Sequence, residues 1–170
     1  IGHSMGGMVV QHYLASHPAP AAVLLASAPP RGLIPATLRI ARRRPLPLLR
    51  ATLTLRLIHT IGTPDLYREA FFSSDISQDA VKAYHVQVQD ESFRAYLDML
   101  WLNLPRPERV DAPLLVLGTR DEQLILPREV EATARAYNTR AEFFSGMGHV
   151  MMLDVGWQDV ADRILEWLGE

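Results

Sequence analysis

The sequence contains no cysteine, so this chain can form neither a disulfide framework nor a thiolate metal site. Net charge is also small: 17 Lys and Arg residues and 19 Asp and Glu residues leave −2, which provides no overall field that favours nucleic acid. Residues 1–30 contain no Asp, Glu, Lys or Arg, as a membrane span would. A span, however, needs roughly 20 mostly apolar residues in a row, and Gln11, Pro18 and Pro20 interrupt this segment. We interpret residues 1–30 as a buried helix and a buried strand. A cytoplasmic location is the expectation, because no basic leader segment is visible.

Apolar residues make up 48% of the chain, which is enough for a packed core. The length of 170 residues suggests one domain with an insertion. Short runs of β-forming residues predict strands at residues 21–26, 113–118 and 141–144. Helical patterns predict helices over residues 5–17, 128–137 and 157–168. Because apolar strands alternate with helices, we predict an α/β fold with a parallel sheet that helices cover on both faces.

The middle of the chain, residues 31–109, is rich in Leu, Arg and Pro and lacks clear strand boundaries. Apolar residues at spacings of three and four predict a helix over 91–103. Ser77, followed by Asp79, predicts the start of the helix before it. The stretch 46–58 fits either a strand or a helix, since some of its leucines alternate and others recur at helical spacing. We favour the helix.

Polar side chains follow the strands at the end where an open parallel sheet binds its ligands. Ser4 lies in a glycine-flanked turn that opens a helix. Asp121 follows the second strand by three residues, and His149 lies in a glycine-rich turn after the third. Serine is a poor nucleophile until a base takes its proton, histidine can be that base, and a carboxylate can fix the histidine tautomer. The sequence therefore predicts a catalytic triad in the order Ser, Asp, His.

Three motifs make the sequence resemble the C-terminal half to two-thirds of an α/β-hydrolase. The segment Gly2-His3-Ser4-Met5-Gly6-Gly7 matches the nucleophile elbow, where small residues let strand and helix approach closely. Gly118-Thr119-Arg120-Asp121 resembles the acid loop after the penultimate strand, and Gly146-Met147-Gly148-His149 resembles the histidine loop. The resemblance implies core segments at residues 1–30 and 110–170, with residues 31–109 inserted as a helical cap.

The resemblance also assigns roles within the elbow and implies a part that this sequence lacks. The backbone N–H of Met5 would be one oxyanion-hole donor at the positive end of its helix, and four neighbours would support the turn: Gly2, His3, Gly6 and Gly7. In the family about five strands precede the elbow, and a loop after one of them supplies the second donor. We therefore expect this chain to be the C-terminal portion of a larger enzyme, completed by the N-terminal half of the same fold.

Other interpretations of the polar residues remain open. Ser4 also suits the N-cap position of a helix, and Asp121 also suits a position in a turn. Glu122 is a rival to Asp121 as the carboxylate of the triad. Asp111 precedes its strand and so lies at the wrong end of the sheet, and Asp154 is better interpreted as a helix-start residue.

Seven arginines form a positive run without any acid: Arg31, Arg39, Arg42, Arg43, Arg44, Arg50 and Arg56. Contact with an anionic substrate or membrane surface would use four of them, Arg39, Arg42, Arg43 and Arg44. We favour the alternative, a solvated cap surface that the acids between residues 65 and 98 balance. The histidines outside the motifs form no pair at metal-binding spacing, so we expect neither a metal nor another cofactor.

Together these features predict a serine hydrolase that cleaves a carboxylic ester with a hydrophobic acyl chain through an acyl-enzyme on Ser4. The ester preference rests on the leucine-rich cap, and the elbow is similar to those of the monoacylglycerol-lipase and lysophospholipase-like branch. Acyltransferases, perhydrolases, peptidases and C–C bond hydrolases share the triad and remain alternatives. The remaining alternative is a catalytically incompetent fragment or pseudoenzyme that only packs against a partner.

Overall fold

The centre of the fold is a parallel sheet of four strands in the order β1 (Gly2–His3), β2 (Ala22–Leu25), β3 (Leu114–Thr119) and β4 (Ala141–Phe144). The computed structural model describes residues 1–169. In the ladder, Leu24 of β2 is paired with Gly2 of β1 and with Val116 of β3. The predicted parallel sheet and all three predicted strands are confirmed, within one residue at each end.

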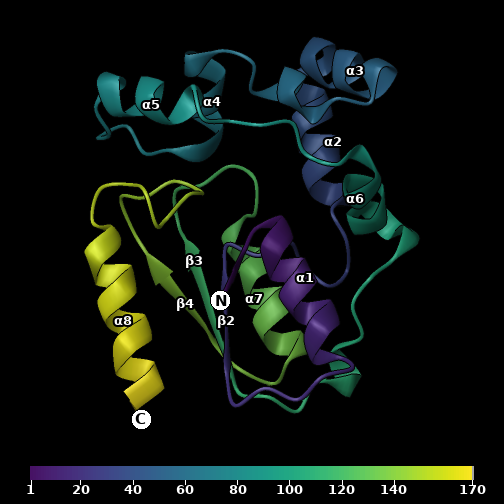
Figure 1. Ribbon diagram of the computed structural model, residues 1–170, viewed down its shortest axis with the longest axis vertical. Coiled ribbons are helices and arrows are strands. Elements are labelled where there is room, and N and C mark those ends of the chain that lie inside the picture. The colour runs from purple at the N-terminus through teal and green to yellow at the C-terminus, as the bar shows by residue number, and fades with distance from the viewer. Residues whose placement is uncertain (170) are drawn as a thin grey trace.

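Helices cover both faces of this sheet (Figure 1). One face carries α1 (Met5–Leu14) and α7 (Pro127–Ala136), and the other carries α8 (Trp157–Gly169). Successive strand residues point to opposite faces, so alternate side chains of β2 and β3 enter two separate clusters. Leu24 and Val116 pack beneath α1 and α7, whereas Val23 and Leu117 pack against α8. The predicted helices 5–17, 128–137 and 157–168 are confirmed, and the first ends at Leu14.

The segment between β2 and β3 forms a cap of short helices above the carboxyl ends of the strands (Figure 1). Its α-helices are α2 (Ile34–Arg43), α3 (Pro45–Thr54), α4 (Pro64–Phe71), α5 (Gln78–His85) and α6 (Phe93–Leu97). A π-helical turn at Asp98–Leu102 and 3₁₀ turns at Leu57–Thr60 and Pro107–Arg109 complete it. The predicted start at Ser77 is confirmed, since its hydroxyl accepts the Ala80 N–H at 3.2 Å. The predicted helix 91–103 is confirmed as α6 and the π-helical turn.

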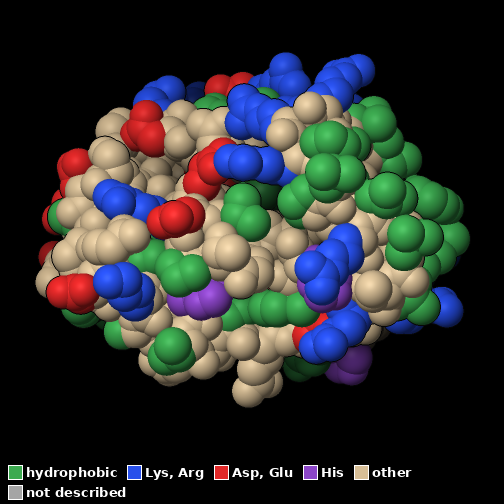
Figure 2. Space-filling view, turned by 90° about the horizontal axis from the view of Figure 1, so that it is seen from above, with side chains coloured by type: hydrophobic (Ala, Val, Ile, Leu, Met, Phe, Trp, Pro, Cys, Tyr) green, Lys and Arg blue, Asp and Glu red, His purple; other side chains and the backbone are tan. Residues whose placement is uncertain are grey.

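Helix α3 resolves the ambiguous stretch 46–58 in favour of the helix, but its leucines do not build the core. Leu46 and Leu53 are each 75% exposed, and Leu55 ends the helix with a left-handed backbone at φ 56°. Viewed from above, this end of the molecule shows a cluster of hydrophobic side chains on its surface (Figure 2). Helical spacing therefore predicted the helix correctly but not the side on which its leucines lie.

Within residues 1–169, none of the helices has the length and apolar character required to cross a membrane.

Candidate active site

The turn at Ser4 joins β1 to α1 and is strained in the way a nucleophile elbow requires. Ser4 has φ 51° and ψ −119°, a region that costs a non-glycine residue about 1–3 kcal/mol. Two backbone hydrogen bonds hold it: Ser4 N–H donates to the Leu25 carbonyl at 3.1 Å, and Ala28 N–H donates to the Ser4 carbonyl at 3.0 Å. The Ser4 hydroxyl makes no capping hydrogen bond to α1, so the N-cap interpretation does not describe this side chain.

Two of the elbow glycines are required by close packing. A Cβ on Gly2 would lie 2.5 Å from the Gly6 carbonyl oxygen, and a Cβ on Gly7 would lie 2.1 Å from the Ser27 hydroxyl. A Cβ on Gly6 would meet no atom within 4 Å. Strand β1 and helix α1 therefore approach closely at Gly2 and Gly7, while packing alone does not explain the glycine at position 6.

His149, the predicted base, lies in a buried pair with a carboxylate. His149 is 1% exposed, and its Nδ1 lies 2.6 Å from Glu122 Oε2. A carboxylate only accepts, so Nδ1 carries the proton that it donates, and Nε2 is left with a free lone pair. His149 Nε2 is buried and has no hydrogen-bond partner among residues 1–169. An unsatisfied buried nitrogen is unfavourable, and here it leaves the imidazole ready to accept a proton.

The prediction that Asp121 orients His149 is wrong in this geometry, and Glu122 takes that place. The Asp121 carboxylate is exposed and accepts the N–H of Gly146 at 2.7 Å, so it fastens the start of the histidine loop. Glu122 is 3% exposed, and its Oε2 also accepts the Ile125 N–H at 3.0 Å. Two adjacent residues leave the end of β3 in different directions, and the sequence gives no signal of which one is buried.

His3 links the elbow to the histidine loop. Its Nε2–H donates to the carbonyl of His149 at 2.9 Å, and the two rings lie 4.7 Å apart. Burial, together with the nearby His149, lowers the pKa of His3 from 6.5 to about 4, although the hydrogen bond to the His149 carbonyl opposes this shift. His3 is therefore neutral at physiological pH, and it contacts His149 directly.

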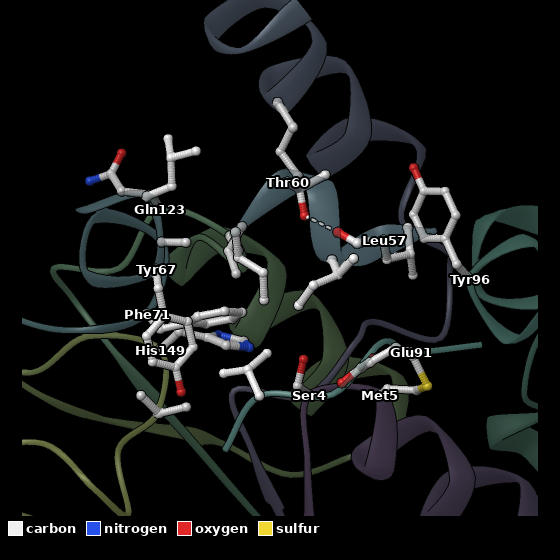
Figure 3. Close-up of a pocket in the computed structure, with 18 of the residues that line it drawn as sticks. Ser4, Met5, Leu57, Thr60, Tyr67, Phe71, Glu91, Tyr96, Gln123 and His149 are labelled. Atoms are coloured by element: carbon white, nitrogen blue, oxygen red, sulfur yellow. Dashed lines mark hydrogen bonds between the residues drawn. The ribbon is translucent and has the colours of Figure 1, made fainter. Parts of the chain in front are cut away.

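Ser4 and His149 both line a cavity of about 720 Å³ between the sheet and the cap. The hydroxyl of Ser4 points into this space, the His149 ring lies to one side of it, and Leu57 and Thr60 of the cap lie opposite (Figure 3). Most of the lining side chains are apolar. Met5 also lines the cavity, and as the first residue of α1 its N–H has no partner within the helix.

Cap arginines pair mainly within the protein. Arg39 forms a two-pronged salt bridge with Glu129 of α7, at 2.8 and 2.6 Å, and thereby ties the cap to the core. Arg43 donates to Gln123, and Arg44 pairs with Glu69. Of the four arginines considered for a membrane surface, Arg42 and Arg43 form no ion pair among residues 1–169. No group of three or more His, Asp or Glu able to hold a metal occurs in that range.

Asp154 lies before α8, as expected, and its carbonyl accepts the N–H of Trp157 at 3.2 Å. Its carboxylate, however, is buried and bonds to the cap and to the histidine loop. Sequence reasoning missed this second role because the partner in the cap, Ser73, is 81 residues away.

The parallel sheet with helices on both faces, the strained turn at Ser4 and the helical segment between β2 and β3 have the arrangement of an α/β-hydrolase. The chain belongs to the alpha/beta hydrolase family, whose family model matches residues 1–163. No curated protein sequence matched this chain.

Solved structures of similar fold include an esterase from Exiguobacterium antarcticum (TM-score 0.68, 16% identity) and a monoacylglycerol lipase from Paleococcus ferrophilus (TM-score 0.63, 21% identity). The enol-lactonase of Burkholderia xenovorans LB400 is similar too (TM-score 0.65, 16% identity). These matches cover 99%, 98% and 99% of this chain, respectively, but only 65%, 66% and 64% of the matched structures. The chain therefore spans less than two thirds of each.

Proposed function

We propose that this chain carries the catalytic residues of a serine hydrolase that cleaves carboxylic esters with a hydrophobic acyl group. The observation that carries the proposal is the buried pair of His149 and Glu122, which opens on the same cavity as the strained Ser4. Membership in the family supports a hydrolase, and the esterase and lipase among the similar structures are consistent with an ester substrate.

In the proposed mechanism, Ser4 Oγ attacks the ester carbonyl while His149 Nε2 takes the hydroxyl proton. Glu122 Oε2 accepts the Nδ1–H of His149, holds the tautomer and stabilises the imidazolium. The Met5 N–H donates to the developing oxyanion at the positive end of α1. The Nε2 proton then passes to the leaving alcohol, and a water molecule deacylates Ser4 by the same route.

The volume and the lining of the cavity support the proposal of a hydrophobic acyl group. Its volume of about 720 Å³ lies within the range of roughly 300–1,000 Å³ that small-molecule sites occupy. The cap supplies apolar walls at Leu48, Leu57 and Phe71, and the core supplies Met5 and Ile125. Burying an apolar chain here would release about 25 cal/mol for each Å² removed from water.

A fluorophosphonate probe on the full-length product of the gene tests the nucleophile. We expect labelling that Ser4→Ala abolishes, together with a fall in ester hydrolysis on the order of 10⁴- to 10⁶-fold. The matched control is Ser145→Ala at an exposed position, which should label like the wild type. Absence of labelling in a folded full-length protein would overturn the proposal.

Product analysis separates hydrolysis from acyl transfer. With a p-nitrophenyl ester as donor and methanol competing with water, a hydrolase gives mainly the free acid. A predominance of methyl ester at low methanol would assign the chain to the acyltransferase alternative. The second oxyanion donor is proposed to come from outside this chain, so both experiments need the full-length protein.

A further inference from the structure

Asp154 is a buried carboxylate that the proposed mechanism does not use. It is 1% exposed, and none of the ion pairs among residues 1–169 includes it. A buried charge without partners would be very unfavourable, and here four hydrogen bonds satisfy it. Oδ2 accepts the N–H groups of Ser73 at 2.6 Å and Gly148 at 2.7 Å. Oδ1 accepts the Ser73 hydroxyl at 2.7 Å and the Val155 N–H at 2.8 Å.

These hydrogen bonds join two parts of the molecule. Ser73 follows α4 in the cap, whereas Gly148 immediately precedes His149. On the other side of the histidine, the Val150 N–H donates to the carbonyl of Phe71 at 3.0 Å. Both chain neighbours of His149 are therefore tied to cap residues 71–73, one through Asp154 and one directly.

The backbones of the two segments also touch. A Cβ on Gly148 would lie 2.5 Å from the Phe71 carbonyl oxygen, so only glycine allows this approach. The ring of Phe71 lies 5.7 Å from that of His149, and Figure 3 shows the two side by side at the wall of the cavity. The histidine loop thus rests directly on the end of α4.

We propose that Asp154 is a positioning residue that fixes the docked cap and the catalytic histidine in one geometry. The proposal rests on the proposed function, because it concerns how His149 is held facing Ser4. When the cap segment 71–73 is displaced, Val150 loses its partner Phe71, and Asp154 loses the two Ser73 hydrogen bonds that help to hold it against Gly148. The imidazole then loses its support. A displacement of about 1 Å at a reacting group can lower a rate on the order of 100-fold.

Asp154→Asn is the main test, because it keeps the size of the side chain. One carboxylate oxygen becomes an NH₂ group that faces N–H donors and cannot accept from them. Ser73→Ala is milder, since it removes the hydroxyl bond and leaves the Ser73 N–H in place. The matched control is Asp162→Asn on the exposed side of α8.

Rates of p-nitrophenyl acetate and p-nitrophenyl octanoate hydrolysis are measured per active site, titrated with a fluorophosphonate. For Asp154→Asn we expect kcat per titrated site to fall about 10- to 100-fold with both esters, and KM to rise for the octanoate alone. Ser73→Ala should mainly raise the octanoate KM, and Asp162→Asn should match the wild type. A purely structural role would lower the number of titratable sites and leave kcat per site unchanged, and that result would overturn the proposal.

Amide hydrogen exchange tests the same connection without catalysis. In Asp154→Asn we expect faster exchange at both Ser73 and Gly148, with α7 unaffected. Faster exchange at only one of the two segments would overturn the proposal. If the wild-type protein neither labels at Ser4 nor hydrolyses esters, the proposed function fails, and the exchange result still decides whether Asp154 joins cap and loop.

Discussion

The core and the cap of this molecule are held together in different ways. In the core, strands β2 and β3 are buried on both faces, and Leu24 and Leu117 are fully inaccessible. In the cap, a small separate cluster forms around Tyr67 and Val81, while α3 exposes leucines to solvent. The core is therefore a continuous packed unit, whereas the cap is a set of short helices joined to it at a few points.

We expect the core and the cap to contribute differently to the proposed reaction. Ser4, Glu122 and His149 all follow core strands, where a rigid frame can hold reacting groups in place. The cap provides much of the cavity wall, where a range of shapes can be tolerated. We expect changes in the core to act on the rate of the chemical step, and changes in the cap to act on substrate choice.

The largest effect should come from the core carboxylate. Glu122→Gln places an amide against His149 Nδ1, which favours the wrong tautomer, and we expect kcat/KM to fall about 10³- to 10⁴-fold. Asp121→Asn is the matched control at the adjacent position, and it should stay within a few-fold of the wild type. Steady-state kinetics on the full-length protein measure both. The reverse order of effects would restore Asp121 as the acid and invalidate the geometry described here.

Filling the cap side of the cavity should change selectivity instead of chemistry. Leu57→Trp takes up space opposite Ser4, and we expect kcat/KM for an octanoyl ester to fall about 10- to 100-fold while that for an acetyl ester changes little. Leu53→Trp, on the exposed side of α3, is the control and should leave both values unchanged. Equal losses with both esters in Leu57→Trp would show that the cap also affects the chemical step.

The ion pair that joins the cap to the core should contribute to the free energy of unfolding. Arg39 and Glu129 are 17% and 13% exposed, and Arg39→Met leaves the Glu129 carboxylate partly buried without its cation. We expect the free energy of unfolding in urea to fall by about 2 kcal/mol. Arg42→Met changes an exposed arginine one turn away and should have little effect. Equal stability of the two variants would mean that the ion pair does not fasten the cap.

The effect of His3 should appear as a change in how the stability of the protein depends on pH. The pKa of His3 falls from 6.5 to about 4 on folding, so the folded state favours the neutral ring and the unfolded chain binds the proton first. This contribution to stability is complete above pH 6.5 and is lost as the pH falls toward 4. The glutamine of His3→Gln does not titrate, so the free energy of unfolding of this variant should fall by about 2 kcal/mol less than that of the wild type between pH 7 and pH 5. Parallel urea titrations at both pH values measure this, and identical pH slopes would contradict it.

The local patterns in the sequence predicted the core accurately and the cap only in outline. The strand runs, the glycine-flanked serine and the histidine loop are short-range signals that act within a few residues. In the cap, α2 and α4 were not predicted individually, although each has a proline in its first turn, which is a local signal for the start of a helix. The spacing of Leu46, Leu49 and Leu53 predicted a helix but could not show that these side chains lie on its exposed side.

What the sequence determined by itself is the α/β order and the positions of the candidate nucleophile Ser4 and the candidate base His149. The tertiary structure alone decided which carboxylate contacts His149, because Asp121 and Glu122 are neighbours in the chain and only the path of the loop after β3 buries one of them. It also decided the contacts of Asp154, whose partners Ser73 and Gly148 lie 81 and 6 residues away. Periodicity and capping are local properties of a chain, whereas the pairing of buried charges depends on which distant segments meet when the chain folds.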